Sequence, residues 1–580
     1  MSAPDREAVV AAAVSAYEAG ARAGTPRLVR SDGSVAIPLE AASLEDAKEL
    51  ARAEVERALD DKAKDASFNG VIEVLFGPAL PKGKKTKFAL AALAAELEEA
   101  FAERPLASGA TLHVHVRRLD AAHWKLDEWK AVHASASKKA VWLERGRAYG
   151  LLLFSAVLMF LGFAGFGVWP LAFVGMVPAL FVFDAEPRPT GAKFFWRALF
   201  FGYVAFYGGF YWVVNTIVDF GGFPYPLALL FASVYFLYQA SQYVLVLWLW
   251  RRARDRGWNA TLSLVSAFLA VELAFPMLFD HFYGTSFHML PWLVQVADLG
   301  GPMLLTALSM LGNGALYEGI RARLRRERMP RAAPIAFAAA LAFCVGYSAY
   351  RIGEVEARAA AAPKITVGLV QTNMGIFDKR EDPLEGRRRH IAQSLALERE
   401  VRPDLLVWPE SAATFFIPEG VDNVRRWVLT AEDGRAVTTP TLFGGLARRA
   451  RDGRVRHYNT AFLTDGEGNV VGTYDKTYLL AFGEYIPFGD VFPILYEWSP
   501  NTGQFTPGDH VRPLRFGDYR ISALVCYEDI LPRFVRRAVA EGDPHLLVNI
   551  TNDAWFGKTH EPYVHLALAK FRAIEHHRYL

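Results

Sequence analysis

The chain has 580 residues, enough for several domains, and its 64 Lys and Arg against 61 Asp and Glu leave a net charge of +3. So small an excess gives no indication of a nucleic-acid partner. A hydrophobic content of 52% and a mean hydropathy of +0.13 exclude a disordered or collagen-like chain and are atypical of a wholly soluble protein. The two cysteines, Cys344 and Cys526, exclude a disulfide framework and a cysteine-rich zinc or iron–sulfur site.

Residues 1–145 are charged and soluble in character. Their apolar patterns predict two helices and two strands: Ser43–Lys62, Thr86–Ala102, Gly70–Phe76 and Thr111–Arg117. We expect a small cytoplasmic α+β domain, and no motif within it indicates a function.

Apolar residues concentrate between residues 146 and 352. The uncharged stretch Ala148–Phe183 is too long for one membrane span, and the turn residues Gly165–Pro170 near its middle predict two spans. Five further runs are long and nearly free of charge: Ala198–Val218, Gly221–Trp250, Gly257–Phe279, Leu299–Tyr317 and Ala332–Tyr350. We therefore predict a polytopic bundle of about seven membrane-spanning helices.

Lys and Arg precede the first predicted span and recur in every second loop, whereas the intervening loops have none. Short loops rich in these residues remain in the cytoplasm. We therefore expect a cytoplasmic N-terminus and, after seven crossings, an extracytoplasmic location for everything beyond Tyr350.

Residues 364–580 alternate strand and helix patterns, and the Ala-rich segment Glu354–Pro363 before them is expected to extend the seventh helix. The predicted strands are Ile365–Gln371, Asp404–Trp408, Thr441–Gly444, Tyr458–Thr464, Tyr519–Cys526 and His545–Ile550. The predicted helices are Glu385–Val401, Phe534–Val539 and Pro562–His577. This alternation predicts an α/β extracytoplasmic domain.

Polar residues at strand ends are candidates for chemistry in such a fold. Glu410 and Cys526 each follow or end a predicted strand, and Lys476 lies between them in sequence. A thiol needs a base to become a nucleophile, and acyl transfer needs a cation or N–H donors for the tetrahedral oxyanion. The alternative is a surface salt bridge with a buried, inert cysteine. An unpaired thiol outside the cytoplasm favours a catalytic use of Cys526.

Five motifs carry a resemblance to a known family: Leu406–Ser411, Tyr474–Lys476, Phe482–Pro487, Val525–Glu528 and Asn552–Gly557. With the predicted spans, they make the chain similar to the apolipoprotein N-acyltransferases, a membrane-embedded family within the nitrilase (carbon–nitrogen hydrolase) superfamily. The resemblance covers about residues 148–580 and does not include residues 1–145.

The resemblance implies a four-layer α-β-β-α catalytic domain over a bundle in the bacterial inner membrane. It implies that the thiolate of Cys526 takes an acyl chain from a phospholipid as a thioester. The α-amine of the diacylglyceryl-cysteine of an apolipoprotein then accepts this chain. Glu410 would be the general base, and Lys476 would stabilise the oxyanion. We expect a monomer that contacts membrane lipids and needs no cofactor, metal or nucleic acid.

The resemblance also implies supporting residues. Glu484 would orient Lys476 or assist proton transfer, and Tyr527 and Glu528 would shape the site beside the nucleophile. Trp292 and Asn373 fall near positions that line the lipid entrance. For Trp292 a place in the aromatic belt at the membrane interface is the alternative.

Two other functions remain open from the residues alone. One is a membrane-anchored amidase or nitrilase that hydrolyses a C–N bond, and the other is a non-catalytic membrane sensor whose α/β domain only binds. In the family, further strands and one more span follow the helix predicted over Pro562–His577. We therefore expect the chain to be C-terminally incomplete, with an open sheet edge and low stability and activity.

Overall fold

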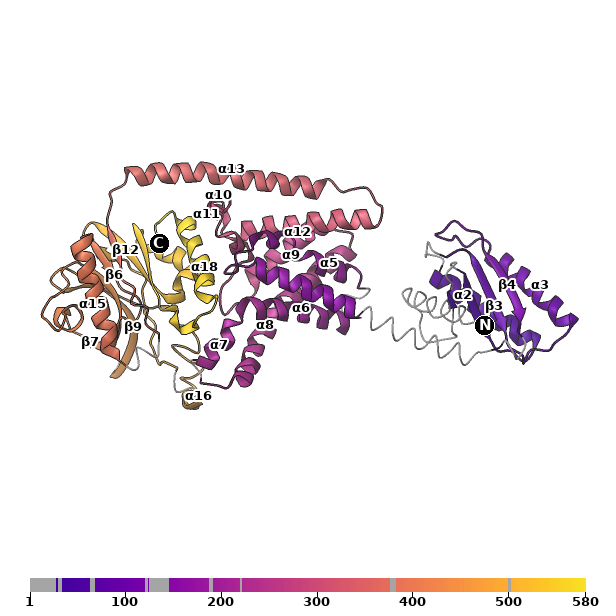
Figure 1. Ribbon diagram of the computed structural model, residues 1–580, viewed down its shortest axis with the longest axis horizontal. Helices are drawn as coiled ribbons and strands as arrows, with labels where there is room; N and C mark the ends of the chain where they lie inside the picture. Colours follow the sequence, from indigo (N-terminus) through magenta and orange to yellow (C-terminus); the bar gives the residue numbers. More distant parts are fainter. Residues whose placement is uncertain are drawn as a thin grey trace. The chain divides into compact units, whose positions relative to one another are not determined.

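The computed structural model describes residues 28–29, 34–62, 68–119, 124, 145–186, 191–219, 222–375, 382–451, 453–498 and 502–580. The chain divides into two compact units, Met1–Gly150 and Leu151–Leu580 (Figure 1).

The first unit contains a sheet in the order β1-β2-β3-β4, formed by Leu28–Val29, Val35–Leu39, Val71–Phe76 and His113–Arg118. Strands β2, β3 and β4 are parallel, and α2 (Leu44–Lys62) and α3 (Lys84–Phe101) connect them. Apolar side chains of both helices are buried in one core with β2 and β3. The predicted helices and strands are present within two residues of their expected ends. The parallel connections make the unit α/β rather than the expected α+β, because residue patterns do not reveal strand direction.

A helical bundle forms the first part of the second unit, and its first helix begins before the boundary between the units. Its α-helices are Arg145–Gly162, α5 (Val177–Asp184), α6 (Ala192–Phe210), α7 (Trp212–Asp219), α8 (Tyr225–Asp255), α9 (Ala260–Ala274), α10 (Pro291–Val294), α11 (Ala297–Gly300), α12 (Met303–Leu324) and α13 (Ala332–Ala361). Among the described residues, three helices are long and apolar enough to cross a membrane: Arg145–Gly162, α8 and α13. The count reaches five if the bent pairs α6–α7 and Pro291–Gly300 with α12 are each one span. Shorter apolar helical segments cover Trp169–Asp184 and Ala260–Ala274. Each predicted run thus coincides with an apolar helical segment, while the number of seven crossings stays a prediction.

Polar side chains stabilise the irregular backbone before α5. The Asn313 amide donates to the carbonyl of Ala172 at 2.7 Å and accepts from the N–H of Met176 at 2.8 Å. The Ser155 hydroxyl donates to the carbonyl of Gly175. Backbone groups in an apolar bundle need such partners, because no water or lipid headgroup can supply them.

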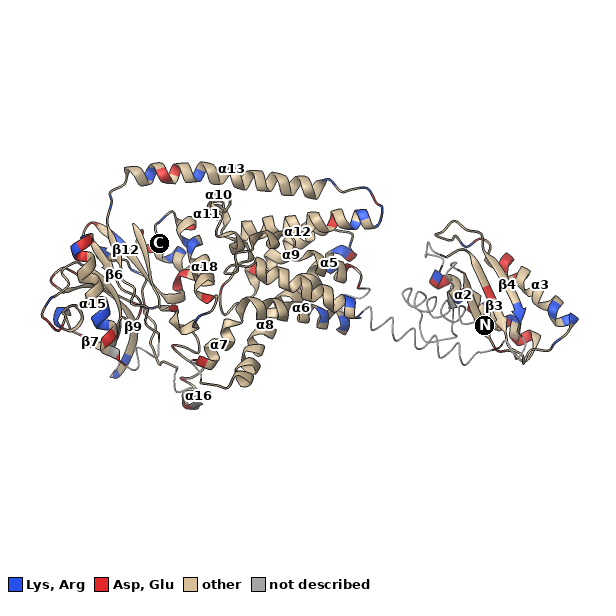
Figure 2. Ribbon diagram, viewed as in Figure 1, with Lys and Arg blue, Asp and Glu red and all other residues tan. Residues whose placement is uncertain are grey.

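Positive charge gathers at one end of the bundle (Figure 2). There, Asp184 at the end of α5 lies 3.5 to 3.9 Å from guanidinium nitrogens of Arg251, Arg254, Arg321 and Arg325, from the C-terminal parts of α8 and α12. The preceding ends of these helices lie toward the α/β domain (Figure 1). The basic residues therefore lie at the end of the bundle away from that domain.

The α/β domain contains two sheets. The larger has the order β10-β9-β8-β6-β5, with β7 paired to β8, and the smaller has the order β11-β12-β13. The strands of the larger sheet are β5 (Val367–Leu369), β6 (Leu405–Val407), β7 (Ala413–Pro418), β8 (Thr441–Arg451), β9 (Arg454–Thr464) and β10 (Val470–Asp475). Those of the smaller sheet are β11 (Leu514–Phe516), β12 (Tyr519–Val525) and β13 (Leu546–Ile550).

Helices cover both sheets. The helix α15 (Pro383–Glu400) lies on the outer side of the larger sheet, where Ser394 accepts a hydrogen bond from the Trp408 indole at 2.9 Å. The helices α17 (Pro532–Gly542) and α18 (Glu561–His576) follow β12 and β13, and α18 lies toward the bundle (Figure 1). All six predicted strands and three predicted helices are present, and α13 extends to Ala361 as expected. Strands β7, β10 and β11 were not expected from the sequence.

The far edge of β13 is partly covered. The N–H of Leu547 donates to the carbonyl of Tyr579 at 2.9 Å, and Leu546 forms an isolated parallel bridge with Tyr579. Tyr579 therefore covers one position of the edge that the sequence predicts to be open.

Candidate active site

Cys526 directly follows the last residue of β12. It has a positive φ of 56° and begins the 3₁₀ turn Cys526–Ile530, which follows the strand without an intervening loop. A non-glycine residue in this left-handed region carries strain that the surrounding structure must offset. The parallel pairing of β12 with β13 holds the strand up to Val525. The turn thus places the thiol, which is 6% exposed, at the carboxyl edge of the sheet.

The Glu528 carboxylate stabilises that turn by accepting hydrogen bonds from backbone N–H groups. One carboxylate oxygen accepts from the N–H of Thr477 at 2.7 Å and of Tyr478 at 2.9 Å, just after Lys476. The other accepts from the N–H of Val525 at 2.8 Å, just before Cys526. The side chain is fully buried, and burial raises its pKa to about 7 although these N–H groups act to lower it. One carboxylate therefore ties the backbone beside Lys476 to the backbone beside Cys526.

Lys476 lies between two carboxylates directly after β10. Its Nζ is 2.8 Å from Glu484 Oε2 and 3.6 Å from Glu410 Oε1, and the side chain is 1% exposed. Asn459 of β9 completes the group, because its amide donates to Glu410 at 2.7 Å and to Glu484 at 2.8 Å. The structure thus brings Glu410 together with Lys476 and Glu484, which lie in later motifs of the sequence.

The electrostatic balance at this site depends on burial. Burial, with the charge of Glu410, raises the pKa of the Cys526 thiol well above its usual range, while Lys476 acts to lower it. Burial also raises the pKa of Glu410, again opposed by Lys476. For Lys476, burial acts to lower the pKa, but the charges of Glu484, Cys526 and Glu410 together raise it well above normal. These directions favour the charged form of Lys476 and the protonated form of the Cys526 thiol.

Tyr527 lies over this cation. Lys476 Nζ is 5.9 Å from the centre of the Tyr527 ring, and the Tyr527 hydroxyl donates to the carbonyl of Leu479 at 3.4 Å. Tyr527 thus lies beside Lys476, and Glu528 contacts backbone next to both Lys476 and Cys526. Their part in shaping the site stays a prediction.

A small cavity of about 30 Å³ adjoins the thiol. The α/β domain lines it with Cys526, Tyr527, Glu561 and His565, among others. The bundle contributes the largely aromatic side chains Phe210, Trp212, Phe279 and His281. The Cys526 thiol therefore shares this cavity with aromatic side chains of the bundle.

Two predicted substrate residues lie outside this cavity's lining. Trp292 of α10 is 45% exposed, as either a lipid-entrance or an interface residue would be. Asn373 is exposed in the segment after β5 and has a positive φ of 50°. Their part in substrate binding stays a prediction.

Sequence reasoning missed Asn459 and the buried cluster around His565. A buried polar residue inside the apolar strand pattern of Tyr458–Thr464 was an available signal for Asn459. For His565, the signal was a set of acidic residues that follow predicted strands, Asp529 and Asp553. Their convergence depends on the folded chain.

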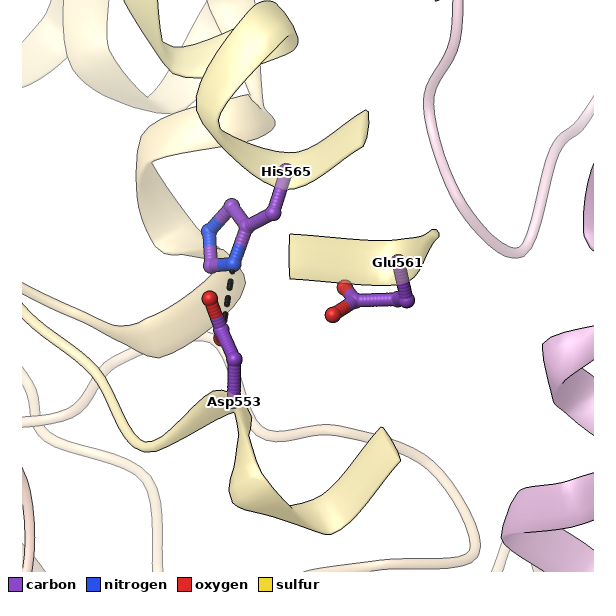
Figure 3. A group of neighbouring side chains, drawn as sticks. All are labelled: Asp553, Glu561 and His565. Atoms are coloured by element: carbon purple, nitrogen blue, oxygen red, sulfur yellow. Dashed lines mark hydrogen bonds and ion pairs between the residues drawn. The ribbon is translucent and has the colours of Figure 1, made fainter. Parts of the chain in front are cut away.

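Asp553, Glu561 and His565 form the described group whose ligand atoms are close enough to hold a metal ion, all lying within 4.8 Å of one another (Figure 3). Both ring nitrogens of His565 already face carboxylate oxygens: Nδ1 is 2.9 Å from Asp553 and Nε2 is 2.9 Å from Asp529. A metal-binding imidazole must offer a free lone pair. In this arrangement His565 therefore does not fit the role of a metal ligand.

Known protein families match both the bundle and the α/β domain. The family model described as apolipoprotein N-acyltransferase N-terminal domain matches residues 155–315, and the carbon–nitrogen hydrolase model matches residues 366–580. An apolipoprotein N-acyltransferase of Geobacter metallireducens is 32% identical over 74% of this chain and 82% of its own length. The chain belongs to the apolipoprotein N-acyltransferase family.

Other members of the family are similarly related. The apolipoprotein N-acyltransferase of Pseudomonas putida is 31% identical over 74% of this chain and 83% of its own length. Among solved structures, an amidase from Nesterenkonia sp. AN1 is 22% identical with a TM-score of 0.21, over 32% of this chain and 67% of that chain. The family match to the carbon–nitrogen hydrolase model identifies the α/β domain as nitrilase-like.

Proposed function

We propose that this membrane protein is an N-acyltransferase that moves an acyl chain from a phospholipid to the N-terminal amine of a diacylglyceryl apolipoprotein, through a thioester on Cys526. The observation that carries the proposal is the buried group of Lys476 between Glu410 and Glu484, beside a thiol at a strained strand end. A carboxylate base, a fixed cation and a thiol are the groups that acyl transfer needs.

In the first half-reaction, Glu410 takes the proton of the Cys526 thiol, and the thiolate attacks the ester carbonyl of the phospholipid. Lys476 stabilises the negative charge on the carbonyl oxygen of the tetrahedral intermediate. The C–O ester bond then breaks, and Glu410 returns the proton to the departing alcohol of the lysophospholipid. The products are the acyl-thioester and a lysophospholipid.

In the second half-reaction, the free α-amine of the diacylglyceryl-cysteine attacks the thioester carbonyl. Glu410 takes a proton from the attacking amine, the C–S bond breaks as the amide forms, and Glu410 returns the proton to the departing Cys526 thiolate. Glu484 and Asn459 keep the side chains of Lys476 and Glu410 in position during both steps. Tyr527 and Glu528 keep the turn around the nucleophile in place.

We further propose that the basic end of the bundle faces the cytoplasm and that the α/β domain is extracytoplasmic, in the bacterial inner membrane. The ring of arginines around Asp184 at the far end of the bundle supports this orientation, since Lys- and Arg-rich loops stay inside. A bundle anchor suits the reaction because lifting an acyl chain from the bilayer costs ~0.8 kcal/mol per CH₂.

The proposal is tested with the purified full chain, a phospholipid of known acyl composition and a diacylglyceryl lipopeptide. Mass spectrometry should find one acyl group on the peptide that contains Cys526 before the lipopeptide is added, and on the lipopeptide amine afterwards. Cys526→Ser should abolish both products, because a serine hydroxyl ionises far less readily than a thiol. Cys344→Ser, which changes the other cysteine, is the matched control and should behave as wild type.

Near-normal N-acylation by the Cys526→Ser protein would end the thioester mechanism. Hydrolysis of an added amide substrate, without acylation of the lipopeptide, would instead favour the membrane-anchored amidase or nitrilase. Absence of both an adduct and any product would favour the non-catalytic sensor.

A further inference from the structure

His565 lies between two carboxylates and lines the same cavity as Cys526. It lies on α18 and its side chain is 5% exposed. Its Nε2 lies 2.9 Å from Asp529 in the turn that begins at Cys526, and its Nδ1 lies 2.9 Å from Asp553 in the turn after β13. Figure 3 shows the Asp553 contact, with the Glu561 carboxyl beside it.

The two contacts define the protonation state of the ring. A neutral imidazole has one N–H donor, so it can donate to only one of two carboxylates. With a carboxylate oxygen at hydrogen-bond distance from each nitrogen, both nitrogens must carry a proton if both acids are ionised. Although burial acts to lower the pKa of His565, Asp529 and Asp553 raise it well above its usual value.

We infer that His565 is a positioning residue that remains an imidazolium, neutralises Asp529 and Asp553 behind Cys526, and thereby sets the acidity of the nucleophilic thiol. This inference rests on the proposed role of Cys526 and adds a second cation to the one supplied by Lys476.

Three observations connect the cluster to the thiol. Asp529 belongs to the same 3₁₀ turn as Cys526, so its position and that of the nucleophile are coupled through the backbone. The charge of Asp553 acts on Cys526 and raises the thiol pKa, after the larger effects of burial, Glu410 and Lys476. Cys526 and His565 also line the same cavity of about 30 Å³. Loss of the imidazolium would therefore leave two uncompensated carboxylates near the thiol.

The other ionisable groups near His565 do not supply the positive charge that contacts Asp529 and Asp553. Burial, with the charge of Asp553, raises the pKa of Glu561 well above normal, although His565 acts to lower it, and Glu561 as a carboxyl group cannot supply positive charge. Arg572 interacts with Asp529 and with Asp280 at a distance, but its Nη2 pairs with Glu575 at 2.6 Å. Asn549 donates to the second oxygen of Asp529 at 2.5 Å without adding charge. Among the described side chains, His565 is thus the cation that contacts both acids.

The test separates charge from packing with three variants of the full chain in detergent. His565→Gln makes the cluster one unit more negative, Asp553→Asn makes it one unit less negative, and the double variant restores the wild-type charge. The rate at which iodoacetamide alkylates Cys526 is followed against pH, by mass spectrometry of the peptide that contains it. Cys344 in α13 gives a separate peptide and serves as an internal reference thiol.

We expect His565→Gln to move the midpoint of the Cys526 alkylation profile upward and to slow alkylation about tenfold at neutral pH. Asp553→Asn should move the midpoint downward, and the double variant should return close to wild type. An unchanged midpoint in His565→Gln would overturn the inference, as would a double variant that is shifted as far as His565→Gln. If the His565→Gln protein does not fold, the Asp553→Asn protein is sufficient as a test. A midpoint of its Cys526 alkylation profile that is unchanged or raised would then overturn the inference.

This readout needs no acyl transfer. A failure to detect an acyl-thioester would contradict the proposed function while leaving the alkylation profiles interpretable. Shifted Cys526 alkylation profiles in the variants, together with acyl transfer by the wild-type protein, would support both the inference about His565 and the proposed function.

Discussion

Asn459 is the residue that connects the two carboxylates around Lys476. Its amide donates to Glu410 and to Glu484, and its backbone carbonyl accepts from the N–H of Lys476 at 2.8 Å. Hydrogen bonds to charged groups stabilise by roughly 1.5–3 kcal/mol each. Asn459 therefore limits the positions that the Glu410 carboxylate and the Lys476 ammonium can take relative to each other.

Replacement of Asn459 by Leu should lower the rate of thioester formation by about 10- to 100-fold, since the isosteric side chain cannot donate to either carboxylate. The measurement is single-turnover acylation of Cys526. Asn469→Leu, an exposed change in the turn between β9 and β10, is the matched control and should retain nearly full activity. Equal rates for the two variants would show that Asn459 has no such role.

Among the elements, β8 determines where the turn that carries Glu410 can lie. The strand passes so close to this turn that a Cβ at Gly444 would lie 2.6 Å from the Glu410 Cα and 2.8 Å from the Pro409 carbonyl oxygen. These are backbone atoms and cannot rotate away. The missing side chain at Gly444 thus allows the sheet and the Glu410 turn to pack directly.

Gly444→Ala should therefore displace the Glu410 turn, destabilise the protein by roughly 1–3 kcal/mol, and reduce transfer by about 100-fold. The neighbouring Gly445→Ala is a matched control, because its nearest contact would be a movable Phe462 side-chain atom at 3.3 Å. Melting temperature and transfer rate are measured for both proteins. Comparable losses in the two variants would mean that the contact with the Glu410 backbone is not the cause.

A second element-scale feature is the contact between the bundle and the α/β domain. The break between α6 and α7 places Tyr211 where its hydroxyl lies 2.7 Å from His560 Nδ1, just before α18. Trp212 packs edge-on against Phe556, with ring centres 5.1 Å apart. The bent pair therefore supports the same turn and helix that hold Asp553 and His565.

At the scale of the whole molecule, the two ends of the bundle differ in charge and in neighbours. Arginines surround Asp184 at one end, whereas the other end contacts the α/β domain through Tyr211 and Trp212. An α/β domain outside the cytoplasm follows if the basic end is inside.

Reporter fusions test this orientation. Alkaline phosphatase joined after Leu580 should be active, because it folds only outside the cytoplasm, whereas the same reporter after Arg328, between α12 and α13, should be inactive. A fluorescent protein that matures only in the cytoplasm should give the opposite pattern. The same result at both positions would show an error in the number of crossings, with the short helix α9 as the first candidate.

Much of the α/β domain was predictable because its signals are local. Apolar runs of strand and helix length, such as Leu405–Val407 and Glu561–His576, survive in the structure within a few residues of their expected ends. Short strands with weak patterns, such as β11, were missed because their stability comes from neighbours and not from their own residues. The bend between α6 and α7 was not predicted either, because the uncharged run Ala198–Val218 continues through it.

The sequence by itself determined the apolar segments, the alternation of basic loops and the motifs that contain Glu410, Lys476 and Cys526. These depend on composition and short spacing. Only the tertiary structure decided that Asn459 joins Glu410 to Glu484, that Glu528 ties Lys476 to Cys526, and that two acids enclose His565. The physical reason is that a buried polar group takes its partner from whichever element packs against it. The partner therefore depends on strand register and on how the helices pack, which bring together residues that lie far apart in the sequence.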